Sequence, residues 1–199
     1  TQRGFHRAYS SASIIHIDGM ALILVHWLTG KFEARRKHRV TYIDLLPEVF
    51  LHLNKIKGRL FFIGGTHALL NEVQKYFREN YPQVNLRSHH GYFEQDSLQD
   101  QNLRKEIKVF EADVILVGMG MPKQEVWIAK SHKEIDHGVF LAGGSCMEYF
   151  TGMAHMPPRW LSRIGFEWLF RLVTNPRKLY KRYLIEPFQL LFLWIFRCV

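Results

Sequence analysis

One stretch decides the fold: Val114-Ile115-Leu116-Val117-Gly118-Met119-Gly120-Met121-Pro122-Lys123-Gln124-Glu125-Val126-Trp127-Ile128. Its first four residues are apolar, which predicts a strand buried on both faces. Two glycines then interrupt the strand and allow a tight turn or a close backbone approach to a ligand. Pro122 suits the first position of a helix, where its missing N–H costs nothing. Lys123, Gln124 and Glu125 would fill the first turn of that helix.

A strand, a glycine turn and a helix N-terminus together form a natural anion site at the carboxyl end of a parallel sheet. An ordinary strand-to-helix turn has the same pattern, so the pattern alone leaves both interpretations open. A second such unit starts at Leu60–Ile63 and continues through Gly64-Gly65-Thr66 into a helix over 68–81. Its glycines could bring N–H groups to a diphosphate, although tight packing would also require small residues.

The remaining elements alternate in the same way. The pattern predicts strands over 13–17, 84–87 and 138–142, and helices over 1–12, 20–28 and 98–110. Alternating strands and helices are typical of an α/β fold. We therefore expect a Rossmann-like, mostly parallel sheet flanked by helices in residues 1–153. Residues 154–199 are expected to form a helical, basic and aromatic appendage.

Composition narrows the class of partner. The 199 residues can bury one substantial core, and a net charge of +9 predicts an anionic partner such as nucleic acid, a membrane surface or a phosphorylated substrate. The positive charge is concentrated near the carboxyl end, because the segment from His155 to Val199 contains eight Lys or Arg and two Glu. Two cysteines are too few for a disulfide framework, which favours a reducing cytosol.

The wording of the motifs is more specific than their pattern. Gly118-Met119-Gly120-Met121-Pro122-Lys123-Gln124-Glu125 is followed by Phe150-Thr151-Gly152, then by Pro157-Pro158-Arg159-Trp160-Leu161, then by Gly165-Phe166-Glu167-Trp168-Leu169-Phe170-Arg171-Leu172. Asp18-Gly19 and Gly91-Tyr92-Phe93 add two shorter matches. Over nearly its whole length the chain resembles the bacterial WecG/TagA/CpsF glycosyltransferases, glycosyltransferase family 26. Such enzymes transfer a sugar from a UDP-sugar to an undecaprenyl-diphosphate-linked acceptor.

The resemblance assigns catalytic roles to two residues. Asp18 follows a predicted strand, and its residue type alone favours a helix cap. The family resemblance instead makes Asp18 the general base, and makes Arg39, in Arg39-Val40-Thr41, an active-site arginine. Two departures from the family pattern follow. Tyr42-Ile43-Asp44-Leu45 lacks a glycine that many relatives have, which leaves the local loop shape open, and Glu148 replaces an Asp.

We expect the substrate-binding residues to come from both parts of the chain. In the core they are Gly64, Gly65, Tyr92, Gly118, Gly120, Gln124 and Glu125, with Tyr92 a candidate for contact with the uracil or a sugar. In the appendage they are Arg171, Arg177 and Arg182, which would contact the acceptor diphosphate. Arg favours such contacts because its guanidinium binds phosphate in a bidentate manner.

The sequence predicts neither a metal nor another cofactor. Metal-dependent transferases often carry an Asp-x-Asp pair, which this chain lacks; Glu111-Ala112-Asp113 precedes its strand and so lies at the wrong end of the sheet. His89-His90 has no Cys or Asp at zinc-ligand spacing. We therefore expect a metal-independent mechanism.

The end of the chain predicts a membrane contact. Residues 187–196 are apolar almost throughout but too short to span a bilayer. A helix packed on the core would explain this pattern. A basic, Trp-rich, apolar segment fits the membrane interface better. We therefore expect a peripheral enzyme on the cytoplasmic face of the bacterial inner membrane, with an anionic membrane surface as a partner and a homo-oligomer left open.

The donor sugar is not legible from the sequence, since relatives use N-acetylmannosamine, its uronic acid or glucose. The chain also starts within a predicted helix, so we expect that an amino-terminal donor-site segment of the relatives is missing. Other functions weighed were a nucleic-acid-binding module, a non-catalytic nucleotide-binding module and a nicotinamide-dependent enzyme. The cations gather beside an apolar terminus, which argues against nucleic acid. Gly118-Met119-Gly120 lacks the third glycine of a dinucleotide motif.

Overall fold

The structure is a computed structural model, and it describes residues 2–17, 23, 39–158, 160–161 and 165–185. By its internal contacts the chain divides into two compact units, Thr1–Ala154 and His155–Val199. Each unit is described by itself.

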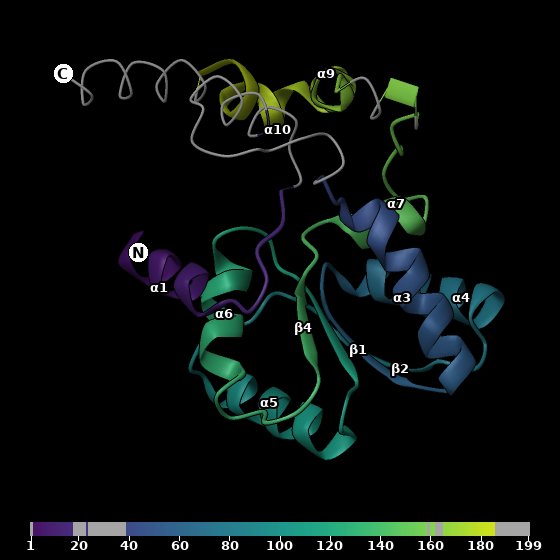
Figure 1. Cartoon of the computed structure of the whole chain (residues 1–199), viewed down its shortest axis with the longest axis vertical. Helices are drawn as coiled ribbons and strands as arrows, with labels where there is room; N and C mark the ends of the chain where they lie inside the picture. Colours follow the sequence, from purple (N-terminus) through teal and green to yellow (C-terminus); the bar gives the residue numbers. More distant parts are fainter. Residues whose placement is uncertain (1, 18–22, 24–38, 159, 162–164, 186–199) are drawn as a thin grey trace. The chain divides into compact units, whose positions relative to one another are not determined.

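The first unit is built on a parallel sheet of four strands, β1 (Arg59–Gly64), β2 (Asn85–His89), β3 (Val114–Gly118) and β4 (Val139–Ala142). Their order across the sheet is β2-β1-β3-β4, and all neighbouring pairs are parallel (Figure 1). The predicted Rossmann-like α/β fold is thus confirmed. From β1 the chain moves outward to β2, then returns past β1 to β3, so its direction of travel reverses between β1 and β3.

Helices cover both faces of this sheet. On one face α3 (Tyr42–Ile56), α4 (His67–Asn80) and α7 (Cys146–Phe150) pack on Leu60, Phe62 and Leu116. On the other, α5 (Leu98–Phe110) and α6 (Lys123–Ser131) pack on Phe61, Ile63 and Ile115. Alternate residues of β1 and β3 therefore belong to two different cores, which is why Leu60–Ile63 and Val114–Val117 are apolar throughout. Helix α1 (Gln2–Ser11) packs against α6 (Figure 1).

Most predicted elements are found within a residue or two, because their ends carry local signals. Thr66 caps α4 by accepting the N–H of Leu69, and Ser97 caps α5 by accepting the N–H of Asp100. The expected place of Pro122 was wrong by one position. Pro122 is the N-cap of α6, and Lys123 is its first helical residue.

Two local expectations before β1 were also wrong. Tyr42–Leu45, which we expected to be a loop, is the first turn of α3; Thr41 caps this helix by accepting the N–H of Asp44. The strand expected over 13–17 is reduced to one parallel bridge, between Ile17 and Arg39. The expected helix over 20–28 lies outside the described residues, apart from residue 23.

The second unit contains α9 (Glu167–Thr174), α10 (Pro176–Tyr180) and a short π-helix, η2 (Lys181–Ile185). Several large apolar side chains of this unit are exposed, among them Trp160, Phe166, Trp168 and Val173. Among the residues described in either unit, we find no helix with the length and apolar character needed to cross a membrane.

Candidate active site

The carboxyl ends of β1 and β3 lie side by side at the point where the chain reverses direction across the sheet. Gly64, the last residue of β1, pairs in register with Gly118, the last residue of β3. In open parallel sheets such a reversal leaves a crevice outside the strand ends, where ligands bind. The two glycine turns predicted from the sequence therefore meet at one edge of the sheet.

The glycines at this edge are of two kinds. A Cβ on Gly64 would lie 2.6 Å from the carbonyl oxygen of Gly118, and one on Gly118 would lie 2.6 Å from that of Gly144. Backbone packing alone therefore accounts for Gly64 and Gly118. Gly120 and Gly144 differ, since both have positive φ, 79° and 57°, and a Cβ on either would meet nothing within 4 Å. These two backbones border open space, as a ligand-facing turn requires.

Gln124 ties the two open turns together. Its Oε1 accepts the N–H of Gly120 at 3.2 Å and the N–H of Gly144 at 3.1 Å. Its Nε2 donates to the carboxylate of Glu125 and to the carbonyl of Ala142. The Gln124 side chain is buried, so both of its polar ends act as a bracket between the loops that follow β3 and β4. The second carboxylate oxygen of Glu125 is buried and has no hydrogen-bond partner among the residues that the structure describes.

Lys123 attaches a third loop to the same edge. Its Nζ donates to the carbonyl oxygens of Gly91 and Phe93, at 2.9 and 3.1 Å, and lies over the Phe93 ring. Gly91 in turn donates its N–H to the carbonyl of Gly65. The loop after β2 is thereby held against the end of β1. Tyr92, which follows Gly91 in this loop, is 70% exposed.

Three histidines gather beside this loop. His89 ends β2, His90 follows it, and His67 begins α4. The His90 ring lies 4.4 Å from the His89 ring and 4.8 Å from the His67 ring, between centroids. Burial, reinforced by repulsion from His89, His67 and Lys123, lowers the pKa of His90. A neutral His90 is consistent with its Nδ1 accepting the N–H of Tyr92.

Of the two predicted catalytic residues, the structure describes only Arg39. Asp18 lies outside the described residues. Its chain neighbour Ile17 forms the parallel bridge with Arg39 and accepts the N–H of Val40 at 3.0 Å. The His16 ring also contacts the Tyr42 ring, with centroids 5.2 Å apart. The segment leading to Asp18 and the segment carrying Arg39 therefore run side by side.

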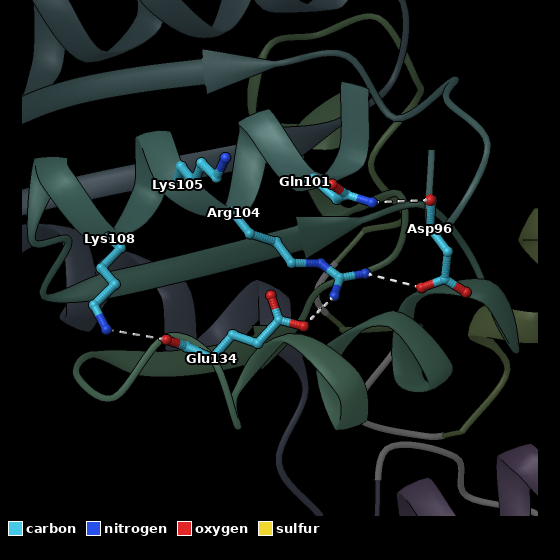
Figure 2. Close-up of a pocket in the computed structure, with 6 residues that line it drawn as sticks. All are labelled: Asp96, Gln101, Arg104, Lys105, Lys108 and Glu134. Atoms are coloured by element: carbon cyan, nitrogen blue, oxygen red, sulfur yellow. Dashed lines mark hydrogen bonds and ion pairs between the residues drawn. The ribbon is translucent and has the colours of Figure 1, made fainter. Parts of the chain in front are cut away.

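A separate cavity of about 440 Å³ lies between α5 and α6 and contains none of the predicted site residues. Figure 2 shows the Arg104 side chain between two of the carboxylates that line it, Asp96 and Glu134. Arg104 donates to Asp96 and to Glu134, while Lys108 donates to the Glu134 carbonyl. Because Arg104, Asp96 and Glu134 are already paired with one another, we interpret this cavity as part of a structural ion-pair network.

The buried part of this ion-pair network is centred on Asp100, which has no exposed surface. Asp100 accepts hydrogen bonds from the Trp127 Nε1–H at 2.7 Å, from the Arg104 guanidinium at 2.6 Å and from the Asp96 N–H at 2.8 Å. Burial on its own would raise the pKa of Asp100, but these hydrogen bonds outweigh it and hold the pKa below its usual range. Asp100 thus joins α5 to α6, the helix that carries Lys123 and Gln124.

The structure describes the side chains of two of the three predicted arginines of the second unit. Arg171 forms an ion pair with Glu167 one helical turn earlier, within α9. Arg177 is exposed at the start of α10. The side chain of Arg182 lies outside the description. No spatial relation between these arginines and the edge of the sheet follows from the structure.

The comparisons with known proteins agree with the motifs. All of the chain, residues 1–199, matches the family described as "Glycosyl transferase WecG/TagA/CpsF family". The chain belongs to that family. It is therefore an enzyme that transfers a sugar. Among its curated relatives is "N-acetylglucosaminyldiphosphoundecaprenol N-acetyl-beta-D-mannosaminyltransferase" of Staphylococcus aureus strain NCTC 8325 / PS 47, 29% identical over 178 residues, covering 87% of this chain and 68% of the relative. The protein of the same name from strain MRSA252 has the same identity and coverage.

Some residues gathered at or near this candidate site could not have been found from the sequence. His67 and Lys123 are separated from His90 by 23 and 33 positions, so no local motif joins them. Asp100 and Trp127 are likewise 27 positions apart. The single signal for the first group was the pair His89-His90 itself, which we had considered only as a zinc site. Among the described residues, no three His, Cys, Asp or Glu side chains are placed to hold a metal ion.

Proposed function

We propose that this glycosyl transferase moves N-acetylmannosamine, or a closely related hexose, from a UDP-sugar to a sugar linked to a polyprenyl diphosphate. One observation carries the proposal: the glycine turns after β1 and β3 meet at the reversal point of the sheet, in a chain that matches the family over its whole length. The name of the relatives supports the sugar and the lipid-diphosphate acceptor. The UDP moiety is inferred from the family motifs.

The reaction requires one proton transfer and one displacement. A base removes the proton from the acceptor hydroxyl as its oxygen forms a bond to the anomeric carbon of the donor sugar. The bond between that carbon and the diphosphate oxygen breaks, and its electron pair leaves with UDP. Attack from the face opposite the leaving group inverts the anomeric centre. The base keeps the proton until solvent removes it.

The residues of this chain divide that work. We assign Asp18 as the base, because a carboxylate accepts a proton without needing a further partner. Arg39 is assigned to the leaving diphosphate; its segment runs beside the one that leads to Asp18. The open turns at Gly120 and Gly144 supply backbone that a ligand can approach, and Gln124 fixes their separation. Because the N–H groups of Gly120 and Gly144 are already donated to Gln124, we assign stabilisation of the charge that develops on the leaving group to Arg39.

We further propose that the second unit brings the enzyme to the acceptor at the cytoplasmic surface of the inner membrane. Exposed aromatic and aliphatic side chains accompany its cations, and that combination suits the headgroup region of an anionic membrane. Arg177 is exposed and Arg171 is already paired with Glu167, so Arg177 is the better placed of the two for a new phosphate contact.

The test is product analysis. The full chain is incubated with a panel of UDP-sugars and with a short-chain polyprenyl diphosphate carrying N-acetylglucosamine, and products are identified by mass spectrometry. We expect a mass increase of one N-acetylhexosamine with UDP-N-acetylmannosamine. Transfer of glucose or of a uronic acid instead would change the donor assignment. No transfer from any UDP-sugar, with a folded protein, would overturn the proposal.

A further inference from the structure

The histidine cluster, His67, His89 and His90, has no role in the mechanism above. It lies at the functional edge of the sheet, because Gly91, which follows His90, packs against both Gly64 and Met119. The rings come from the end of β2, the residue after it and the start of α4, and the His90 ring contacts the rings of both His67 and His89. A cluster of imidazoles at the mouth of a crevice is chemically equipped to bind an anion.

The charges around the cluster are of one sign. In the part of the chain that the structure describes, none of the three rings forms an ion pair with a carboxylate, whereas His137 pairs with Asp136 at 3.3 Å. The Lys123 ammonium faces His90 from α6, and the N-terminus of α4 adds its positive dipole end at His67. Tyr92 donates its N–H to His90 Nδ1, and the Gln99 amide lies at hydrogen-bond distance from His90 Nε2.

The three rings differ in their freedom to accept a proton. His90 uses Nδ1 as an acceptor for the Tyr92 N–H, so protonation there would break that bond. His89 donates from Nδ1 to the carbonyl of His90 at 2.8 Å, which leaves its Nε2 available for a proton. His67 is exposed, and its ring lies edge-on to the His90 ring. Among the described residues, His67 and His89 therefore each keep a ring nitrogen that no hydrogen bond occupies.

We propose that His67 and His89 bind the diphosphate of a substrate and take up a proton as they do so. A bound diphosphate supplies the negative charge that the cluster lacks, and it turns mutual repulsion into attraction. Binding is then linked to pH and is stronger on the acid side of neutrality. The choice of diphosphate rests on the proposed function, in which both the nucleotide donor and the lipid acceptor carry one.

The experiment measures proton uptake on binding. Isothermal titration calorimetry is run with the full chain at pH 6, 7 and 8, in phosphate-free buffers of different ionisation enthalpy. Inorganic pyrophosphate, UDP and farnesyl diphosphate are titrated in turn into the wild type, His67→Gln, His67→Gln/His89→Gln, and the control His52→Gln. His52 is an exposed histidine of α3 that forms none of these contacts. Protons carried by the ligand itself are common to all variants and cancel in the comparison.

We expect the wild type and His52→Gln to take up about one proton more per diphosphate than the double variant near pH 7. Between pH 6 and pH 8 their affinity should fall about tenfold further than that of the double variant. His67→Gln should lie between them. If the histidine substitutions change proton uptake with UDP alone, the cluster binds the diphosphate of the donor. If they change it with farnesyl diphosphate alone, the cluster binds the diphosphate of the acceptor. Either result supports the proposal.

The same uptake in wild type and double variant, for all three ligands, would overturn the proposal. Circular dichroism at each pH verifies that the variants are folded, and the exposed His67 single variant still tests the idea if the double variant is not. Failure of the proposed function has a different signature. In that case no UDP-sugar is transferred, while pyrophosphate binding still depends on His67 and His89. Normal transfer with histidine-independent binding refutes the cluster alone.

Discussion

The buried carboxylate Asp100 permits the most quantitative prediction. Its side chain has no exposed surface, and it accepts hydrogen bonds from Trp127, Arg104 and the Asp96 backbone. Asp100→Asn keeps the shape of the side chain but removes its charge. It also replaces one acceptor oxygen by an amide that faces donors. Arg104, itself only 5% exposed, then loses the counter-charge that is fully buried with it, whereas Glu134 and Asp96 are exposed.

The magnitude follows from those contacts. Breaking a buried ion pair by neutralising one partner costs about 3–5 kcal/mol, and Arg104 retains Glu134 and Asp96, so we expect about 3 kcal/mol. For a chain of this size that corresponds to a fall in Tm of roughly 6–12 °C. Asp136→Asn is the matched control, because Asp136 is exposed although it contacts both Lys108 and His137. Its unfolding midpoint should not change measurably.

Urea denaturation followed by circular dichroism gives the free energy of unfolding of both variants. If Asp100→Asn unfolds at the same urea concentration as Asp136→Asn, the buried network contributes nothing and the reasoning is refuted. A further arm is Asp100→Asn/Arg104→Met, which removes the stranded cation. It should be more stable than Asp100→Asn alone, since an unpaired buried charge is the main cost.

Four further predictions concern pH, catalysis, metals and the membrane. Since the pKa of Asp100 is lowered in the fold, its stabilisation is present above the unfolded value of about 4 and is lost as pH falls through the folded value; acid unfolding monitored by fluorescence should therefore be less steep in Asp100→Asn. Asp18→Asn should reduce turnover by about 10²–10⁴-fold with little change in Tm, and a variant keeping more than about a tenth of wild-type turnover would point to a capping role instead. Turnover should survive EDTA, whereas loss of turnover that magnesium or manganese restores would reveal a metal site. Truncation before Pro187 should release the protein from anionic liposomes in a flotation assay, and continued flotation would mean that the terminus is not the anchor.

The sequence determined the local units of this protein. Four apolar residues before Gly118, and four before Gly64, were enough to predict two strands and the glycine turns after them, because strand burial and turn chemistry are properties of neighbouring residues. The predicted bounds of the helix over 98–110 are also those of α5. The helix over Tyr42–Ile56 was missed, although Thr41 and Asp44 carried a usable capping signal.

Tertiary structure decided what those units share. The strand order depends on whether the next strand pairs with one edge of β1 or with the other. Packing between residues far apart in the sequence decides between these two edges. The order β2-β1-β3-β4 puts Gly64 opposite Gly118, and it brings His67 to His90. It also showed that Gly64 and Gly118 are small because backbones touch there, whereas Gly120 and Gly144 border open space. The sequence gives the position of each glycine, but only the packed chain shows whether backbone or open space lies where a side chain would be.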